Sequence, residues 1–437
     1  MTPPDVSSGD SKPQLLIDIA VPGARAVLVV DRVGQHGAFG GVRIVPDLRV
    51  DELVAGARAM GRKFAFINVP IGGAKSAIEA PTELAGEERR RLLHSFGRAI
   101  APLIRANTYL PACDMGTDES DLSAILNAAG IPLTPNQVDS SRATALTIVE
   151  AVRQVATRIG VPVSSIRLAL EGLGKVGGHV ASMLSAEGAR LVAVSTADGA
   201  LLSKRGLDVA RLLQLRATHG SRLVAHYDEG DARRAPHREL FETTCDILLP
   251  GVRSHVIDAT LADSIDARAV VPFSNAGVRP EAEERLTRRG VVVLPDYVAN
   301  CGGIIAVDLR SVGFGRPDDV DRVVTTVYRD AVAAALTMAE RSGVPIGEVC
   351  RRVAEENRRS LVDNSSPYAR GVVGGFDAGP SAVMRRIAWR LHKRGVLPSR
   401  FRSYAMARFL EWRLDVTRAR MIASTQSGCG DTSTSST

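Results

Sequence analysis

Cysteine, aromatic residues and lysine are all scarce in this chain of 437 residues. The five cysteines are scattered, with no Cys-x-x-Cys pair, which argues against a disulfide framework or a structural zinc site. No run of about 18 apolar residues occurs, and the polar N-terminus lacks the apolar core of a signal peptide. We therefore expect a cytoplasmic protein that neither spans a membrane nor follows the classical secretory route.

Positive charge is concentrated near the C-terminus. The net charge is +7, yet between Ser381 and Met421 eleven lysines and arginines face only two acids. The remainder of the chain is nearly neutral, so this charge does not by itself predict a nucleic-acid partner. Aromatic residues in this basic segment recur at helical spacing, which favours packing on the body or on another subunit over contact with nucleic acid.

Only six of the 55 basic residues are lysines, so arginine is the usual cation of this chain. Burial can lower the pKa of a lysine amine into the range of a general base, which arginine cannot match. Lys63 and Lys75 are separated by an apolar run at residues 64–69 and a double glycine. We interpret that run as a strand with Lys63 at one end and Lys75 in a backbone-lined pocket at the other. The alternative is two surface lysines.

The apolar pattern predicts two α/β segments followed by helices. Strand-like runs at 15–19 and 26–30 are followed by helices that begin at Asp51 and cover 87–104. Beyond residue 141, helical stretches separate short β-branched strands, which is typical of a parallel, doubly wound sheet. These strands are predicted at 166–170, 190–195, 247–249, 269–272 and 291–294. The predicted helices are 143–159, 176–186, 319–339, 347–364, 382–394 and 401–422.

The segment Gly172-Leu173-Gly174-Lys175-Val176-Gly177 has the spacing G-x-G-x-x-G between a predicted strand and a predicted helix. In that setting the glycines permit a tight turn and a close approach of a pyrophosphate to the backbone. The first N–H groups of the helix then face the phosphates. We interpret the segment as a dinucleotide-binding loop, and the alternative is a turn that merely joins strand to helix.

The choice between NAD and NADP stays open in the sequence. An acid that holds the ribose hydroxyls is expected at the end of the second strand. Here that end reads Ser195-Thr196-Ala197-Asp198, so the acid comes a few residues after the expected position. Three cations are alternative partners for the 2′-phosphate of NADP: Lys175, Lys204 and Arg205.

Asp114 lies in the segment Pro111-Ala-Cys-Asp114-Met-Gly-Thr-Asp118, ahead of a predicted helix. An Asp in such a place is normally a helix cap. Because Asp118 can fill that role, capping does not account for Asp114.

Together these motifs resemble the glutamate/leucine/phenylalanine/valine dehydrogenases over residues 37–308. The segments that carry the resemblance are Phe39-Gly40-Gly41-Val-Arg43, Lys63, Gly-Gly-Ala-Lys75, Pro-Ala-Cys-Asp114-Met-Gly-Thr, Arg142-Ala-Thr144, the glycine loop, Asp246-Ile-Leu-Leu-Pro250, Asn275 and Pro295-Asp-Tyr-Val-Ala-Asn300-Cys-Gly-Gly303. The resemblance implies an N-terminal α/β substrate domain (14–142), a Rossmann-type dinucleotide-binding domain (143–305) and C-terminal helices (306–423) that return to the first domain. The tails 1–13 and 424–437 are predicted to be disordered.

The resemblance also implies reversible oxidative deamination of an L-amino acid by a homo-oligomer, with NAD or NADP as cofactor and hydride transfer in a cleft between the domains. By the family pattern, Lys63 clamps the substrate α-carboxylate, Lys75 activates water against the imine, and Asp114 shuttles protons to and from the amine. The positions where the family contacts the nicotinamide or its ribose are Thr144, Asn275 and Asn300.

Glutamate-specific members resemble one another in a lysine before the Gly-Gly-x-Arg motif and a serine after the Asn-x-Gly-Gly motif, which hold the side-chain carboxylate. Here those positions are Phe39 and Val307. A buried γ-carboxylate would lack a partner beside these side chains, so we expect an apolar substrate, branched-chain or aromatic. The implied substrate-binding set is Lys63, Phe39, Gly40, Gly41 and Val307.

Two alternatives remain. In the first, Phe39 points into the core, Arg43 serves the carboxylate, and the chain is a glutamate dehydrogenase. In the second, the chain is a catalytically idle NAD(P)-binding regulatory protein. Its regulatory or scaffolding role would act through the basic C-terminal segment. Departures from the family pattern gather on the cofactor side and bear on cofactor preference and turnover, namely Ala145, Lys175, Phe273-Ser274 and His255.

Overall fold

The computed structural model describes residues 12–34, 37–69, 71–81, 83–131, 139–311, 316–363 and 410. These residues divide into two compact units, one holding the chain up to Pro135 and again from Asn357, the other holding Asn136–Glu356. The helix α14 (Ile346–Asp363) therefore contributes to both units. Apart from residue 410, the basic segment and the predicted helices at 382–394 and 401–422 lie outside the described residues. The domain boundaries inferred from the sequence stay predictions.

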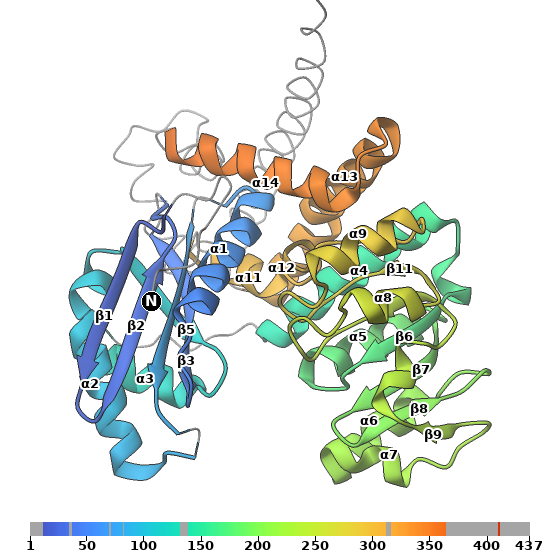
Figure 1. The fold of residues 1–437 in the computed structure, drawn as a ribbon, viewed down its shortest axis with the longest axis horizontal. Helices are drawn as coiled ribbons and strands as arrows, with labels where there is room; N and C mark the ends of the chain where they lie inside the picture. The colour runs from blue at the N-terminus through green and yellow to red at the C-terminus, as the bar shows by residue number, and fades with distance from the viewer. Residues whose placement is uncertain are drawn as a thin grey trace, which may run out of the picture. The chain divides into compact units, whose positions relative to one another are not determined.

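The first unit is a five-stranded mixed sheet in the order β1-β2-β4-β3-β5, with helices on both faces (Figure 1). Its strands are β1 (Leu15–Val21), β2 (Ala24–Val30), β3 (Ala38–Val45), β4 (Gly72–Glu79) and β5 (Tyr109–Cys113). Its helices are α1 (Val50–Phe66), α2 (Gly86–Arg105) and α3 (Glu119–Ala128). Alternate residues of the strands pack against α1 on one face, where Val27 and Val29 meet Leu53 and Ala57. The larger core lies on the α2 face.

The predicted helices at Asp51 and 87–104 are confirmed as α1 and α2, whereas the strand predicted at 64–69 is wrong. Residues 64–66 form the end of α1, and the chain then turns, with the N–H of Val69 donating to the carbonyl of Phe64 at 2.8 Å. The run is buried on every side, so its sequence shows neither helical nor strand periodicity.

Helix α1 lies very close to β4 because Gly73 has no side chain. A Cβ on Gly73 would overlap the carbonyl oxygen of Ala57 and the backbone nitrogen of Gly61. Backbone atoms in a helix cannot rotate away, so a methyl group here forces the helix off the sheet. The double glycine before Lys75 therefore sets the distance between α1 and the strand that carries this lysine.

We expect Gly73→Ala to lower the free energy of unfolding by about 1–3 kcal/mol, because the extra methyl overpacks a rigid contact. Gly56→Ala is the matched control, since a Cβ there would meet the Lys75 side chain at an ordinary 3.4 Å. Chemical denaturation of both variants measures the difference. Equal stability of the two variants would contradict the close contact.

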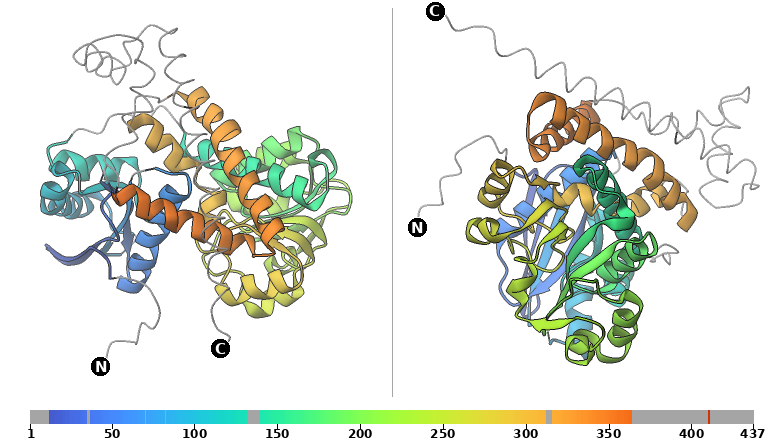
Figure 2. Two further views of the ribbon diagram at one scale, coloured as in Figure 1. Left: turned by 90° about the horizontal axis from the view of Figure 1, so that it is seen from above. Right: turned by 90° about the vertical axis from the view of Figure 1, so that its right-hand side faces the viewer.

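The second unit contains a seven-stranded sheet in the order β12-β11-β10-β6-β7-β8-β9, with helices on both faces (Figure 2). The strands from β12 to β7 run parallel, and the antiparallel strands β8 and β9 add to one edge. The strands are β6 (Arg167–Glu171), β7 (Arg190–Thr196), β8 (Gly199–Leu202), β9 (Arg233–Ala235), β10 (Cys245–Leu249), β11 (Ala267–Val270) and β12 (Val292–Val293). The strand order reverses at β6, and ligands of such sheets bind beside that point, at the carboxyl ends of the strands.

Helices and helical turns complete the second unit. They are α4 (Ser140–Ile159), η1 (Val163–Ser165), α5 (Lys175–Ala186), α6 (Val209–His219), η2 (Gly220–Arg222), α7 (Leu223–His226), η3 (His237–Leu240), α8 (Ala259–Ser264), α9 (Pro280–Arg288), α10 (Asp296–Ala299), α11 (Gly302–Ser311), α12 (Pro317–Val323), the π-helix η4 (Val324–Tyr328) and α13 (Arg329–Ser342). The α/β fold with a largely parallel second sheet is confirmed, and the helix predicted at 319–339 lies within the unbroken helical run of α12, η4 and α13, whose middle part is a π-helix. Among the described residues, no helix is long and apolar enough for a membrane span, and no three potential metal ligands cluster.

Candidate active site

One face of the first sheet, the face covered by α1, gathers most of the predicted substrate-side residues. Strands β3 and β4 run parallel, with Phe39 beside Gly73 and Arg43 beside Ala77. Since side chains alternate along a strand, Lys75 lies on the same face as Gly73 and Ala77. A Cβ on Gly56 of α1 would contact the Lys75 side chain, so this lysine is covered by α1. Only 6% of Lys75 is exposed.

Asp114 follows β5 by one residue and meets two cations from the neighbouring strands. Its Oδ2 forms an ion pair with Lys75 Nζ and accepts a hydrogen bond from Arg43 Nε at 2.9 Å. Gly41 leaves the room for this carboxyl group, since a Cβ there would lie 2.5 Å from the Cβ of Asp114. The structure therefore brings Lys75, Asp114 and Gly41 together, and it adds Arg43 to them.

Burial and the neighbouring charges move the pKa values of Lys75 and Asp114 away from their ordinary values. Burial lowers the pKa of Lys75, and the nearby Asp114 opposes that shift only in part. Burial acts to raise the pKa of Asp114, but the positive charges of Lys75 and Arg43 outweigh it and lower that pKa. The cluster thus combines an ionised carboxylate with an amine that loses its proton more readily than a free lysine.

The loop around Asp114 is fixed by hydrogen bonds. The Asp114 N–H donates to Thr117 Oγ1 at 2.9 Å, and that hydroxyl donates to the Val42 carbonyl at 2.8 Å. Asp118 accepts from the N–H groups of Ser120 and Asp121 and caps α3, as predicted, which leaves Asp114 to its cations.

Lys63 lies in the last turn of α1 and is buried. Phe64 follows Lys63 in the chain, and its ring meets the ring of Phe39 edge-on, with centroids 5.8 Å apart. Phe39 remains half-buried on this face. An aromatic side chain therefore stands beside the end of α1 that carries Lys63.

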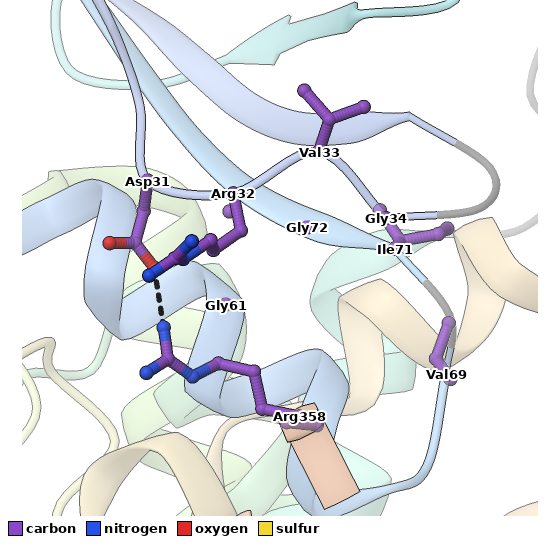
Figure 3. Close-up of a pocket in the computed structure, with 11 residues that line it drawn as sticks. Asp31, Arg32, Val33, Gly34, Gly61, Val69, Ile71, Gly72 and Arg358 are labelled. Atoms are coloured by element: carbon purple, nitrogen blue, oxygen red, sulfur yellow. Dashed lines mark ion pairs between the residues drawn. The ribbon is translucent and has the colours of Figure 1, made fainter. Parts of the chain in front are cut away.

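A small cavity of about 30 Å³ lies elsewhere in the first unit, between the end of β2, α1 and Arg358 of α14 (Figure 3). Asp31 is 4% exposed there and pairs with Arg358 at 3.5 Å and with Arg58 at 3.8 Å. A space of that size accommodates little more than a water molecule. We therefore place the candidate active site at Lys75 and Asp114 rather than in this cavity.

The second unit builds the glycine loop at the carboxyl end of β6. Gly172 adopts φ +91°, and a Cβ on Gly177 would overlap the carbonyl oxygen of Gly172. A Cβ on Gly174 would meet nothing within 4 Å, and no side chain caps the start of α5. The loop therefore presents uncapped N–H groups of α5 beside open space, which fits the pyrophosphate of a dinucleotide. Lys175 and Val176 begin this helix, and Leu173 is buried beneath the loop.

Three predicted nicotinamide contacts lie on loops and helix starts of the same unit. Asn300 is 8% exposed, and its Nδ2 lies 3.4 Å from Asn275 Oδ1, while its own Oδ1 is buried without a hydrogen bond. A buried acceptor with no partner fits the amide of a nicotinamide. Thr144 is the fifth residue of α4, and a Cβ on Gly303 would approach its hydroxyl to 3.3 Å.

The residues proposed to contact the adenosine half of the cofactor lie in two different places. Thr196 ends β7, with its hydroxyl donating to the Ser221 carbonyl at 2.7 Å, and Asp198 lies exposed in the following turn. Lys204 and Arg205 follow Ser203, whose N–H donates to the Val192 carbonyl in the first half of β7. The interpretation of these two cations as partners of a 2′-phosphate is therefore wrong, because they lie at the opposite end of the strand from the glycine loop.

Comparison with known proteins decides the family. A family model described as "Glutamate/Leucine/Phenylalanine/Valine dehydrogenase" matches residues 138–356, and the model of its "dimerisation domain" matches residues 24–129. The chain belongs to this family. The family resemblance and the fold inferred from it are both confirmed.

The names of individual relatives refer to different substrates. The chain is 33% identical over 280 residues to an NAD-specific glutamate dehydrogenase of Staphylococcus aureus strain COL. The match covers 61% of this chain and 66% of the relative, so the chain spans slightly under two thirds of the relative's length. A hetero-hexameric glutamate dehydrogenase from Thermus thermophilus, solved with Leu bound, has TM-score 0.71 at 27% identity, covering 81% and 91% of the two chains. An L-tryptophan dehydrogenase from Nostoc punctiforme has TM-score 0.61 at 19% identity, covering 80% and 96%, and shows the fold alone.

Sequence reasoning placed Arg43 only as a possible partner of a substrate carboxylate. In this family member its guanidinium binds Asp114 instead. Gly41 and Arg43 share a face, as residues at i and i+2 of a strand do, but their approach to Asp114 depends on the pairing of β3 with β5. The other predicted substrate residue, Val307, is half-buried in α11 of the second unit.

Proposed function

We propose that this chain is an NAD(P)-dependent dehydrogenase that converts an L-amino acid and water to a 2-oxo acid and ammonia. The observation that carries the proposal is the buried Lys75, paired with an ionised Asp114 that Arg43 also binds. Such a group supplies a base and a proton carrier, which deamination of an amino acid requires. Membership of the dehydrogenase family supports the reaction class.

In this proposal each residue has one task. Bound NAD(P)⁺ supplies the acceptor for the hydride of the substrate Cα. Lys63 binds the α-carboxylate of the substrate. The neutral Lys75 amine takes a proton from the water that attacks the imine, and Asp114 carries protons to and from the amine nitrogen. The glycine loop holds the pyrophosphate, while Thr144, Asn275 and Asn300 orient the nicotinamide end.

We further propose an apolar substrate. Phe39 stands on the site face, packed against Phe64, and supplies no charge for a γ-carboxylate. Arg43, the alternative cation, is already bound to Asp114. Glutamate oxidation is the second candidate, supported by the name of the Staphylococcus aureus relative. A panel of leucine, valine, phenylalanine, tryptophan and glutamate with NAD⁺ or NADP⁺ tests both candidates, and binding of cofactor without any turnover would support the idle regulatory protein.

We expect Phe39→Lys to raise the ratio of kcat/KM for glutamate over leucine by at least about tenfold, because the new ammonium gives the γ-carboxylate a charged partner. Phe39→Leu keeps the position apolar and serves as the control. Initial rates with both amino acids measure the ratio. If Phe39→Lys and Phe39→Leu change the ratio equally, residue 39 does not face the substrate side chain.

Arg43 lowers the pKa values of both Asp114 and Lys75 through its positive charge, although burial is the larger influence on each. Removing this charge in Arg43→Gln raises both pKa values. A base that must be unprotonated then works only at higher pH, so we expect the acid limb of the kcat/KM profile to move to higher pH. Arg43→Lys keeps the charge and should keep the limb near the wild-type position. An unmoved limb in Arg43→Gln would contradict this role.

The family model over residues 24–129 bears the name of a dimerisation domain. We therefore include self-association in the proposal, as a homo-oligomer. Light scattering of the purified full-length chain measures the oligomer mass directly.

A further inference from the structure

Glu171 is a fully buried carboxylate in the second unit, directly before the first glycine of the dinucleotide loop. Its Oε2 accepts hydrogen bonds from the N–H groups of Gly251, at 3.0 Å, and Val252, at 3.2 Å. Its Oε1 is buried and accepts no hydrogen bond. A buried carboxylate with one unsatisfied oxygen is costly, so its presence beside a binding loop needs a cause.

His237 of η3 is the charge partner of this free oxygen. Its Nε2 lies 3.3 Å from Glu171 Oε1, a contact of charges whose geometry is not that of a hydrogen bond. The side chain of His237 is 39% exposed, so it exchanges protons with solvent, whereas Glu171 is closed off. The charge that His237 presents to Glu171 therefore depends on whether its imidazole carries a proton.

Neighbouring elements carry other charged groups. On η3, Arg238 pairs with Glu242 and Glu239 pairs with Arg233. Lys175 at the start of α5 and Arg253 after β10 are exposed. Among the residues that the structure describes, His237 is the one that pairs with Glu171.

Glu171 also determines how the loop after β10 meets the glycine loop. Its two hydrogen bonds hold Gly251 and Val252 against the end of β6. Val252 in turn covers Gly172, since a Cβ on that glycine would overlap the Val252 side chain. Movement of the carboxylate therefore moves the wall of the site that receives the pyrophosphate.

We propose that Glu171 is a positioning residue of the dinucleotide loop and that protonated His237 supplies the charge that makes a pyrophosphate acceptable beside it. This inference rests on the proposed NAD(P) site. A bound pyrophosphate adds negative charge next to Gly172. With His237 protonated, the charge of Glu171 is balanced, and with His237 neutral, two negative groups face each other. Loss of the proton from His237 therefore weakens cofactor binding.

The test measures binding of NADH and NADPH by fluorescence, without amino-acid substrate, from about pH 6 to about pH 9. We expect the wild-type dissociation constant to rise by about tenfold over this range. Glu171→Gln keeps the shape and both accepted hydrogen bonds but removes the negative charge, so its dissociation constant should change by less than about twofold. His237→Gln, at a partly exposed position, should also lose the pH dependence and bind weakly throughout.

His179→Gln is the matched control. His179 Nε2 lies 3.3 Å from Asp139 Oδ2, the same separation, but that carboxylate is 54% exposed. This variant should keep the wild-type pH dependence. If the dependence persists in Glu171→Gln or His237→Gln, or is absent from the wild type, the inference fails while the NAD(P) site stands. If the wild type binds neither dinucleotide at any pH, the proposed function itself fails.

Proton uptake gives a second readout that a purely structural role would not change. If protonation of His237 favours the cofactor, the cofactor must favour protonation by the same free energy. Calorimetry in buffers of different ionisation enthalpy should therefore show the wild type taking up protons on binding NADH or NADPH. Glu171→Gln should show less uptake, and equal uptake in both proteins would overturn the inference.

Discussion

In Lys75→Ala, kcat for amino-acid oxidation should fall by at least about 10³-fold, while the dissociation constant for the reduced cofactor changes by less than about twofold. The loss follows from the burial that lowers the pKa of Lys75 and makes its amine available as a base. The cofactor is unaffected because the glycine loop, at Gly172 and Gly174, belongs to the other compact unit. Steady-state rates and fluorescence titration with NADH and NADPH measure the two quantities separately.

Two further variants separate base catalysis from charge. Lys75→Arg keeps a cation beside Asp114 but cannot lose its proton, so it should be nearly as inactive as Lys75→Ala. Lys204→Ala removes an exposed lysine beyond β8 and should keep full activity. Substantial turnover in Lys75→Arg would reduce Lys75 to an electrostatic role. Substantial turnover in Lys75→Ala would remove it from the mechanism.

The elements that the sequence predicts best are those with a clear apolar period. Helix α2 and the strands β6 and β7 appear close to their predicted bounds. Strands β3 and β4 were missed because they carry Gly40, Gly41 and Gly73, which usually weaken a strand. The structure explains these glycines by close contact, since a Cβ on Gly40 would overlap the Ala74 carbonyl and one on Gly73 would overlap α1. Tertiary contact, which no local pattern reports, overrides propensity at these positions.

The candidate site likewise has a part that the sequence predicts and a part that depends on tertiary contact. The scarcity of lysine and the spare Asp114 pointed to the pair that the structure joins. The ion pair between Arg43 and Asp114 depends on β3 and β5 being neighbours, and strand order is not written in the spacing of residues. The Tyr109 hydroxyl, which donates to the Gly40 carbonyl at 3.1 Å from the opposite face, was missed for the same reason.

A short strand explains the error at the cofactor side. Strand β8, which forms an antiparallel hairpin with β7, was not predicted, because it is only four residues long. When β8 is left out, Lys204 and Arg205 are expected just after the end of β7. The antiparallel return of β8 carries them back along that strand, so a short unpredicted element reversed the direction in which two charges lie.

Asp114→Asn should lower kcat by about 10²–10⁴-fold, because an amide cannot accept and return the protons of the substrate amine. The substitution keeps the shape of the side chain, so the room left by Gly41 still accommodates it. It also removes the negative charge that raises the pKa of Lys75 against burial, so that pKa falls further. The activity that remains should therefore extend to lower pH than in the wild type.

The pH profile makes this prediction specific to the chemistry. Asp118→Asn is the control four residues away, where asparagine still caps α3 and activity should stay within about twofold of the wild type. If Asp114→Asn merely disturbed the fold, rate and thermal stability would fall together and the acid limb would keep its position. An acid limb that moves downward in a folded Asp114→Asn variant, and upward in Arg43→Gln, would tie both groups to the protonation of Lys75. Unmoved limbs in both variants would show that Lys75 titrates independently of them, contrary to the ion pair and hydrogen bond that join the three side chains.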